Sequence, residues 1–227
     1  MSLKTRSLVF VTFLGNFVVV GLLVAAFTTD RWVEADARRH NSTESSGRVN
    51  LGLFAGTKEL NVGYGARRHD ISVPQFIAAE PDLMSYWLWL GTALGGGLAL
   101  FSSTVAGIAA ILKSASTRKR KGTVVLLFVA NIASVLSHLI AFACWLAQFL
   151  IHLHENVLSR EDQNNLWYTG GLARLGLSFH ILVLGIAIIV LNIICLIIAV
   201  YLERKEHRVT TELLSGDEKT QGVIMLY

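Results

Sequence analysis

The sequence predicts an all-α membrane protein, a left-handed four-helix transmembrane bundle that carries a small extracellular β-sheet. Of its 227 residues, 53% are hydrophobic and only 16% are charged, and the mean hydropathy is +0.53. Four apolar runs are each long enough to cross a hydrocarbon core of about 30 Å as a helix. These runs cover residues 8–27, 86–112, 124–151 and 175–202.

The first run follows the basic residues Lys4 and Arg6, an order that also occurs in a cleaved signal peptide. Val24, Ala25 and Ala26 would provide a passable cleavage site. However, the run is longer than the roughly 7–15 apolar residues of a signal peptide, and its removal would leave three spans. We therefore interpret it as the first membrane span.

Basic residues predict how the chain is oriented in the membrane. Arg118, Lys119, Arg120 and Lys121 crowd the short segment between the second and third runs, which contains no acidic residue. Further basic residues precede the first run and follow the fourth. The positive-inside rule therefore places both termini in the cytoplasm.

This topology predicts one four-span domain over residues 1–203, followed by a cytoplasmic tail over residues 204–227. The two extracellular loops are then residues 28–85 and 152–174. We expect an integral, multi-pass protein of the plasma membrane. The net charge of +4 comes from residues at the membrane edges, so it gives no reason to expect nucleic acid as a partner.

The first extracellular loop begins with the polar stretch "DARRHNSTESSGR", which we expect to be mobile. It contains the sequon Asn41-Ser42-Thr43. Because the topology places this loop outside the cytoplasm, we expect Asn41 to be glycosylated.

The second half of this loop, residues 49–77, has a different composition. The segments "VNLGLFAG", "ELNVGYGA" and "DISVPQFI" contain β-forming residues and are separated by glycine and charged residues. We expect these segments to form a small antiparallel sheet on the extracellular face of the membrane.

The second run carries a small residue at every fourth position, on one face of the expected helix. Such a face lets a second helix approach closely, which favours helix packing inside a membrane. We interpret it as a seam within the bundle, with the interface of a homo-oligomer or of another membrane protein as the alternative. Its residues are Gly91, Gly95, Ala99, Ser103 and Gly107.

The third run carries a polar stripe at steps of about three and four residues, which is the period of a helix face. Polar side chains in hydrocarbon need hydrogen-bond partners, so the stripe should face the bundle interior. Asn16 in the first run and Asn192 in the fourth are the expected partners. The stripe consists of Asn131, Ser134, His138, Trp145 and Gln148.

The third run is also longer than the hydrocarbon core requires. Its helix would extend about 42 Å at 1.5 Å per residue. We expect the helix either to tilt or to project beyond the outer membrane surface and support the extracellular layer.

The motifs of enzymes and metal sites are missing from the sequence. His138 and His180 lie in spans without acidic residues, so they lack the further ligands of a metal site or the carboxylates of a proton relay. No nucleophile elbow, metalloprotease motif or phosphate-binding loop occurs. We therefore expect a protein without enzymatic activity, metal or cofactor.

The order of elements resembles the claudin-like superfamily of four-span membrane proteins, whose long loop is the first. In that superfamily the loop carries a Trp, then Gly-Leu-Trp, then two cysteines. Here Trp32 and Gly52-Leu53-Phe54 match the first two elements. The loop cysteines are missing, because both cysteines of the chain lie inside apolar runs. A tight-junction claudin with a disulfide-bonded loop is therefore not expected.

The chain is more similar to the clarins, over its whole length. "TTDRW" after the first run resembles the clarin Thr-x-x-Trp exit, and Asn41 stands where clarins carry a sequon. "LGLFAG" and "GYGAR" are similar to the clarin Gly-Leu-Phe and Gly-x-Gly-Ala-Arg elements. The ending "MLY" resembles their hydrophobic tail that ends in Tyr. The resemblance implies a claudin-like bundle and sheet.

The residues of this resemblance also predict how the first loop docks onto the bundle. Trp32 is expected to anchor the loop in the headgroup layer, although an ordinary interfacial tryptophan explains it equally well. Gly52, Leu53 and Phe54 are expected to join the sheet to the outer helix ends, with Leu53 and Phe54 buried there. Without a disulfide, this apolar contact must provide more of the loop's stability.

The resemblance implies a non-enzymatic membrane organiser that supports sensory cells through contacts with other membrane or matrix proteins. One alternative is a claudin-like paracellular barrier, with Arg67, Arg68 and Asp70 as candidate ion-selecting residues. Another alternative is an auxiliary subunit of a channel or receptor.

The end of the chain, Met225, Leu226 and Tyr227, is a candidate scaffold-binding motif. Its last and third-from-last residues are hydrophobic, a pattern that some PDZ domains accept by strand addition. The expected partners are therefore the lipid bilayer, other membrane or matrix proteins, and a cytoplasmic scaffold of the PDZ type.

Overall fold

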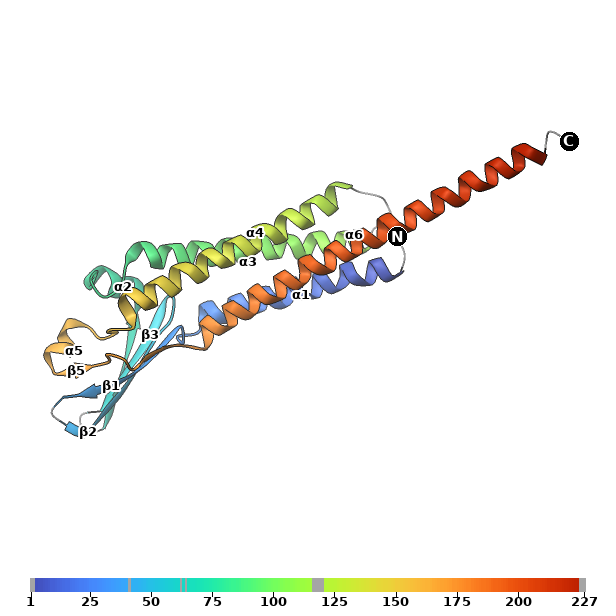
Figure 1. Ribbon diagram of the computed structural model, residues 1–227. Coiled ribbons are helices and arrows are strands. Elements are labelled where there is room, and N and C mark those ends of the chain that lie inside the picture. Colours follow the sequence, from blue (N-terminus) through green and yellow to red (C-terminus); the bar gives the residue numbers. More distant parts are fainter. Residues whose placement is uncertain (1–2, 41, 62, 64, 116–120, 225–227) are drawn as a thin grey trace.

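The computed structural model shows a bundle of long helices with a β-sheet at one end (Figure 1). Within the described part of the chain, four helices are long and apolar enough to cross a membrane. This finding confirms the four predicted apolar helices and indicates a multi-pass membrane protein. The structure describes residues 3–40, 42–61, 63, 65–115 and 121–224.

The first three long helices follow the predicted apolar runs. Helix α1 comprises Leu3–Thr28 and helix α3 comprises Tyr86–Ala115. Helix α4 comprises Lys121–Gln148 and continues as a π-helical turn, η1, over Phe149–Leu153. Phe149 and Leu153 pack in one apolar cluster with residues of the sheet, so the outer end of α4 projects into the sheet layer.

Helix α6 comprises Leu177–Ile224, 48 residues. It begins two residues later than the predicted fourth run, because Leu175 belongs to a strand. It also continues through most of the predicted tail, for which no secondary structure was predicted. This part of the helix leaves the bundle as a single rod (Figure 1). Glu, Lys, Arg and Leu dominate the start of this extension, and all four are strong helix formers.

The bundle is held together by packing of α3 along α4 and α1, and of α6 along α1 and α4. Its buried residues form one cluster that extends into the sheet and a smaller cluster near the opposite end. The start of α1 and the end of α6 both lie at the end opposite the sheet (Figure 1). The left-handed crossing of the helices stays a prediction.

The sheet of the described residues is antiparallel and has the strand order β4-β3-β2-β1-β5, with β6 also paired to β1. Its first four strands come from residues 33–72, and the last two come from the second loop. The bounds are Val33–Arg39 for β1, Ser42–Leu51 for β2, Ala55–Asn61 for β3, Ala66–Ser72 for β4, Trp167–Tyr168 for β5 and Ala173–Leu175 for β6.

Two expectations about this sheet are wrong. The polar stretch expected to be mobile forms most of β1 and β2, which pair from Val33↔Leu51 onward. The segment "DISVPQFI" is not one strand, because β4 ends at Ser72 and helix α2 follows over Val73–Ala79. Pro74 favours this helix start, since its φ angle is fixed near the helical value and it has no N–H to leave unpaired.

Strand β1 alternates between a buried and an exposed side. Val33, Ala35 and Ala37 are buried, whereas the intervening residues are charged and at least partly exposed. Successive side chains of a strand point to opposite faces, so this alternation puts one apolar face against the core. We call the sheet together with α2 and the short helix α5, Arg160–Asn164, the cap layer.

Candidate functional site

Trp32 joins the start of the cap layer to the bundle. Its indole Nε1 donates a hydrogen bond to the carbonyl oxygen of Ala26 at 2.7 Å. Its ring packs edge-on against Trp145, with the ring centroids 4.8 Å apart. The side chain is fully buried. Trp32 therefore lies in the core between sheet and bundle, and not in contact with headgroups as the sequence suggested.

Gly52 lies where the loop between β2 and β3 passes closest to the end of α1. Its N–H donates to the carbonyl oxygen of Ala55 at 2.9 Å. A Cβ atom at this position would lie 2.7 Å from the carbonyl oxygen of Thr29 and 2.8 Å from the Cα of Asp30. Only glycine fits this close approach of two backbones.

Leu53 and Phe54 both contact the bundle, but only one of them is buried. The Leu53 side chain is fully buried, and its carbonyl oxygen accepts a hydrogen bond from Trp89 Nε1 at 2.7 Å. Phe54 is 45% exposed, although its ring meets Phe27 and Trp89 edge-on. The expectation that Phe54 is buried is therefore wrong.

A buried ion pair joins the first loop to the second. Lys58 Nζ on β3 lies 2.6 Å from Asp162 Oδ2 on α5, and both side chains are mostly buried. Ser159 Oγ donates to the same carboxylate oxygen at 2.8 Å. This ion pair could not be predicted from sequence patterns, because its two residues are 104 positions apart.

The second loop also completes the sheet. Ala173 and Leu175 on β6 pair with Ala35 and Val33 on β1, and Trp167 on β5 is buried in the apolar cluster. The cap layer is therefore one unit built from both loops. This arrangement was not predicted, because strands of two or three residues are too short to be recognised from composition.

The face of the sheet opposite the core carries charges that alternate in sign across four strands. The strand register aligns Asp36 with Arg48, Arg48 with Glu59, and Glu59 with Arg68. Directly opposed side chains on one face lie about 4.5–5.5 Å apart at their Cβ atoms. This row is therefore a ladder of opposite charges on an exposed surface. It was not predicted, because it depends on the register between strands.

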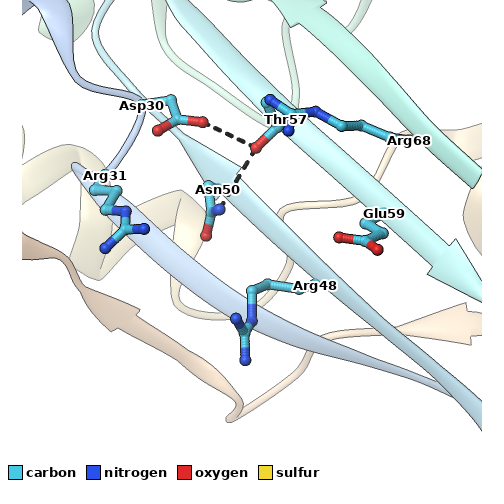
Figure 2. A pocket seen from close by; sticks show the side chains of 7 residues that line it. All are labelled: Asp30, Arg31, Arg48, Asn50, Thr57, Glu59 and Arg68. Atoms are coloured by element: carbon cyan, nitrogen blue, oxygen red, sulfur yellow. Dashed lines mark hydrogen bonds between the residues drawn. The ribbon is translucent and has the colours of Figure 1, made fainter. Parts of the chain in front are cut away.

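A pocket of about 250 Å³ opens on this charged face, next to the end of α1 (Figure 2). At its floor, Thr57 Oγ1 donates to Asp30 Oδ2 at 2.9 Å and accepts a longer bond from Asn50 Nδ2 at 3.4 Å. The lining residues are Asp30, Arg31, Arg48, Asn50, Thr57, Glu59 and Arg68.

The predicted stripe of small residues on α3 faces other helices of the same chain. Gly95 lies against the backbone of α4, since a Cβ there would be 2.9 Å from Ala141 N. Ser103 Oγ lies 2.7 Å from Ser134 Oγ of α4, and Ala99 is fully buried. Gly91 faces Cys144 of α4, and Gly107 faces Asn16 of α1.

The predicted polar stripe on α4 is also buried. Asn131, Ser134, His138 and Gln148 are all inaccessible to solvent. The His138 ring atom Nδ1 lies 2.8 Å from the carbonyl oxygen of Ser134. Buried atoms without a hydrogen-bond partner within the described part of the chain include Asn131 Oδ1, His138 Nε2 and both side-chain polar atoms of Gln148.

The expected partners of this stripe, Asn16 and Asn192, do not bond to it among the described residues. Asn16 Nδ2 donates to the carbonyl oxygen of Thr12 at 2.8 Å, and Asn131 Nδ2 donates to that of Leu127 at 2.8 Å. Both bonds stay within one helix, four residues back along the chain. Asn192 packs against Gly15 of α1. The structure therefore brings these amides into the interior without the predicted bonds between helices.

The candidate site residues Asn41, Met225, Leu226 and Tyr227 lie outside the described residues, as do Arg118, Lys119 and Arg120 of the basic segment. Among the residues that the structure does describe, no three His, Cys, Asp or Glu side chains gather as a metal site would require. No protein-family model and no curated protein matches this chain.

Proposed function

We propose that this chain is a non-enzymatic membrane organiser of the clarin type, with the cap layer outside the cell and both termini in the cytoplasm. The sequence resemblance to clarins supports the type. The basic residues at the end of the bundle opposite the cap support the orientation. The missing enzyme motifs support a role in binding rather than in catalysis.

The observation that carries this proposal is the rigid attachment of the cap layer. Two contacts join it to the bundle, Trp32 on Trp145 and the Leu53 carbonyl on Trp89, and the pair of Lys58 with Asp162 holds its two loops together. A surface that is ordered before binding loses less conformational freedom when a partner binds. The cap layer therefore suits the recognition of other membrane proteins or of matrix.

The opposite end of the molecule offers a second contact point. Helix α6 continues from the last residue of its span, Glu206, to Ile224, a distance of about 27 Å at 1.5 Å per residue. This rod would hold the candidate scaffold motif at residues 225–227 away from the membrane surface. The organiser would thus link partners on one side of the membrane to a cytoplasmic scaffold on the other.

A role in sensory cells rests on the resemblance alone. For the claudin-like alternative, the charge ladder is unfavourable evidence. Its signs alternate across Asp36, Arg48, Glu59 and Arg68, whereas an ion-selecting surface needs a field of one sign.

Cross-linking on intact cells tests the organiser role. Cells that express the full chain are treated with a membrane-impermeant cross-linker, and the captured proteins are identified by mass spectrometry. Asp162→Asn removes the negative charge that pairs with Lys58 and leaves a mostly buried ammonium group uncompensated, a loss of about 3 kcal/mol at the low end of the range for buried pairs. We expect this variant to reach the cell surface but to capture fewer partners.

The matched control is Asp70→Asn, because the pair of Asp70 with Arg68 is largely exposed and such pairs contribute about 0–1 kcal/mol. It should capture the same partners as the wild type. An unchanged partner set in Asp162→Asn would contradict the proposal. Strands at cell contacts together with altered transepithelial resistance would favour the claudin-like alternative, and co-purification with a channel whose gating changes would favour an auxiliary subunit.

A further inference from the structure

The pocket on the charged face of the sheet lies directly beyond the ends of two candidate membrane spans. Helix α1 ends at Thr28, and the pocket residues Asp30 and Arg31 follow directly. The carbonyl oxygen of Arg31 accepts a hydrogen bond from the N–H of Ser178, in the first turn of α6, at 2.9 Å. The pocket therefore begins where two membrane-spanning helices end.

The lining of the pocket stays close to these helix ends. The headgroup layer adds roughly 5–7 Å on each side of the hydrocarbon core. Asn50 is adjacent to Leu51, whose carbonyl oxygen accepts from the N–H of Trp32. Arg48 is two residues further along β2, about 7 Å at 3.3–3.4 Å per residue. In a bilayer crossed by α1 and α6, the lining side chains would therefore be within reach of the phosphate and the groups attached to it.

The pocket presents charges of both signs. Arg31, Arg48 and Arg68 contribute guanidinium groups, and Asp30 and Glu59 contribute carboxylates. Figure 2 shows Asp30 and Arg31 on one side of the pocket and Glu59 on the other. Guanidinium groups suit phosphate oxygens, and carboxylates suit a cationic group. A zwitterionic headgroup matches this set better than an anion alone.

The lining also distinguishes between the two common zwitterionic headgroups. A quaternary choline group has no N–H donor and is recognised by aromatic rings. None of the seven lining residues is aromatic. A primary ammonium group has three N–H donors, which pair with carboxylate and amide oxygens. Asp30, Glu59 and Asn50 supply such oxygens.

We propose that this pocket binds the headgroup of a phosphatidylethanolamine lipid. Arg31 and Arg48 hold the phosphate, and Asp30 and Glu59 accept hydrogen bonds from the ammonium group. The cap layer thereby gains a contact with the membrane surface in addition to its contacts with the bundle. This inference requires only that the helices cross a bilayer, so it does not depend on the proposed role as an organiser.

Lipid retention tests the proposal. The purified full chain is placed in nanodiscs of dioleoyl-phosphatidylcholine that contain a minor fraction of dioleoyl-phosphatidylethanolamine or, in a parallel set, dioleoyl-phosphatidylglycerol. Lipids that stay bound after release into detergent are counted by native mass spectrometry. We expect phosphatidylethanolamine to be enriched about fivefold over phosphatidylcholine, as one favourable exposed ion pair allows.

The variant Asp30→Asn/Glu59→Gln removes both negative charges but keeps an oxygen that accepts from Thr57. It should abolish the enrichment while leaving the thermal unfolding midpoint close to that of the wild type. Arg31→Gln should lower the amount of retained phosphatidylethanolamine. The controls Arg67→Gln and Glu161→Gln change exposed charges outside the pocket, and they should retain the full enrichment.

Three results would overturn the proposal. One is an enrichment of phosphatidylethanolamine that survives Asp30→Asn/Glu59→Gln. Another is phosphatidylglycerol retained as well as or better than phosphatidylethanolamine, which would mean that the arginines select a net negative lipid. An equal loss of lipid in the two control variants would show that retention depends on surface charge in general and would also contradict it.

Discussion

At the scale of single residues, the cap layer is attached by side chains that contact both the sheet and the helices. Trp32 packs its ring against Trp145 of α4 and donates its indole N–H to the carbonyl oxygen of Ala26. Trp89 of α3 meets the ring of Phe54 and donates its indole N–H to the carbonyl oxygen of Leu53. A tryptophan can do both because its ring is large and its N–H is a donor only. These two residues therefore connect the cap layer to the bundle by ring packing and by hydrogen bonds to the backbone.

The first prediction concerns Trp32. Trp32→Phe keeps an aromatic ring but loses the hydrogen bond to Ala26, which costs about 1 kcal/mol. Trp32→Ala leaves a cavity and costs about 3–5 kcal/mol. For a chain of this size, each kcal/mol lowers the unfolding midpoint by about 2–4 °C. Thermal unfolding of the purified protein in detergent measures both changes.

Trp87 provides the control for this prediction. It is 76% exposed, so Trp87→Ala should change the unfolding midpoint far less than Trp32→Ala does. Equal shifts for the two substitutions would show that Trp32 has no special role in joining the cap layer to the bundle.

At the scale of elements, the packing of α3 depends on a face without large side chains. Gly95 lies against backbone atoms of α4, and Gly107 lies against α1. Because lipid chains are as apolar as the side chains of the helices, close packing rather than hydrophobicity drives helices together inside a membrane. The same face is therefore occupied within the chain and is closed to a second copy.

The second prediction compares two neighbouring glycines of α3. A Cβ at Gly95 would lie 2.9 Å from Ala141 N and 3.0 Å from Ser137 O, whereas a Cβ at Gly97 would meet nothing within 4 Å. Gly95→Ala should destabilise the fold by about 1–3 kcal/mol through overpacking. Gly97→Ala should stabilise it by up to about 1 kcal/mol through helix propensity.

The readout is the unfolding midpoint, which should move in opposite directions for the two substitutions. A decrease of the same size in both would mean that glycine is needed along this helix for a reason other than its contact with α4.

At the scale of the whole molecule, the cap layer lies at one end of the bundle, and the start of α1 and the end of α6 lie at the other (Figure 1). Helix α3 ends at Ala115 and helix α4 begins at Lys121, also at the end away from the cap layer. In a membrane crossed by these helices, the cap layer and these helix ends would face different compartments.

The third prediction tests this orientation by glycosylation. The wild-type protein from mammalian cells should lose apparent mass after glycosidase treatment, and Asn41→Gln should show no such change. Ala115→Asn in the Asn41→Gln background creates the same Asn-Ser-Thr sequence on the other side of the membrane, where no glycan is added. If that double variant were sensitive to glycosidase, the orientation would be the opposite of the one predicted.

The sequence alone determined the parts of this protein that depend on local composition. Each long apolar helix can be predicted from about twenty consecutive residues, because a helix makes all its backbone hydrogen bonds within its own segment. The small residues of α3 and the polar residues of α4 were likewise found from helical spacing. Strand β1 was missed although "VEADARR" alternates apolar and charged residues, because its alanines and acidic residues are poor strand formers.

Only the tertiary structure decided how the two loops combine. The pairing of β1 with β6, the ion pair between Lys58 and Asp162, and the pocket beside Arg31 all join segments that are far apart in the chain. Each segment by itself has too little apolar surface to fold. Which segments pair depends on how the helix ends are arranged in space. A short stretch of sequence does not contain that information.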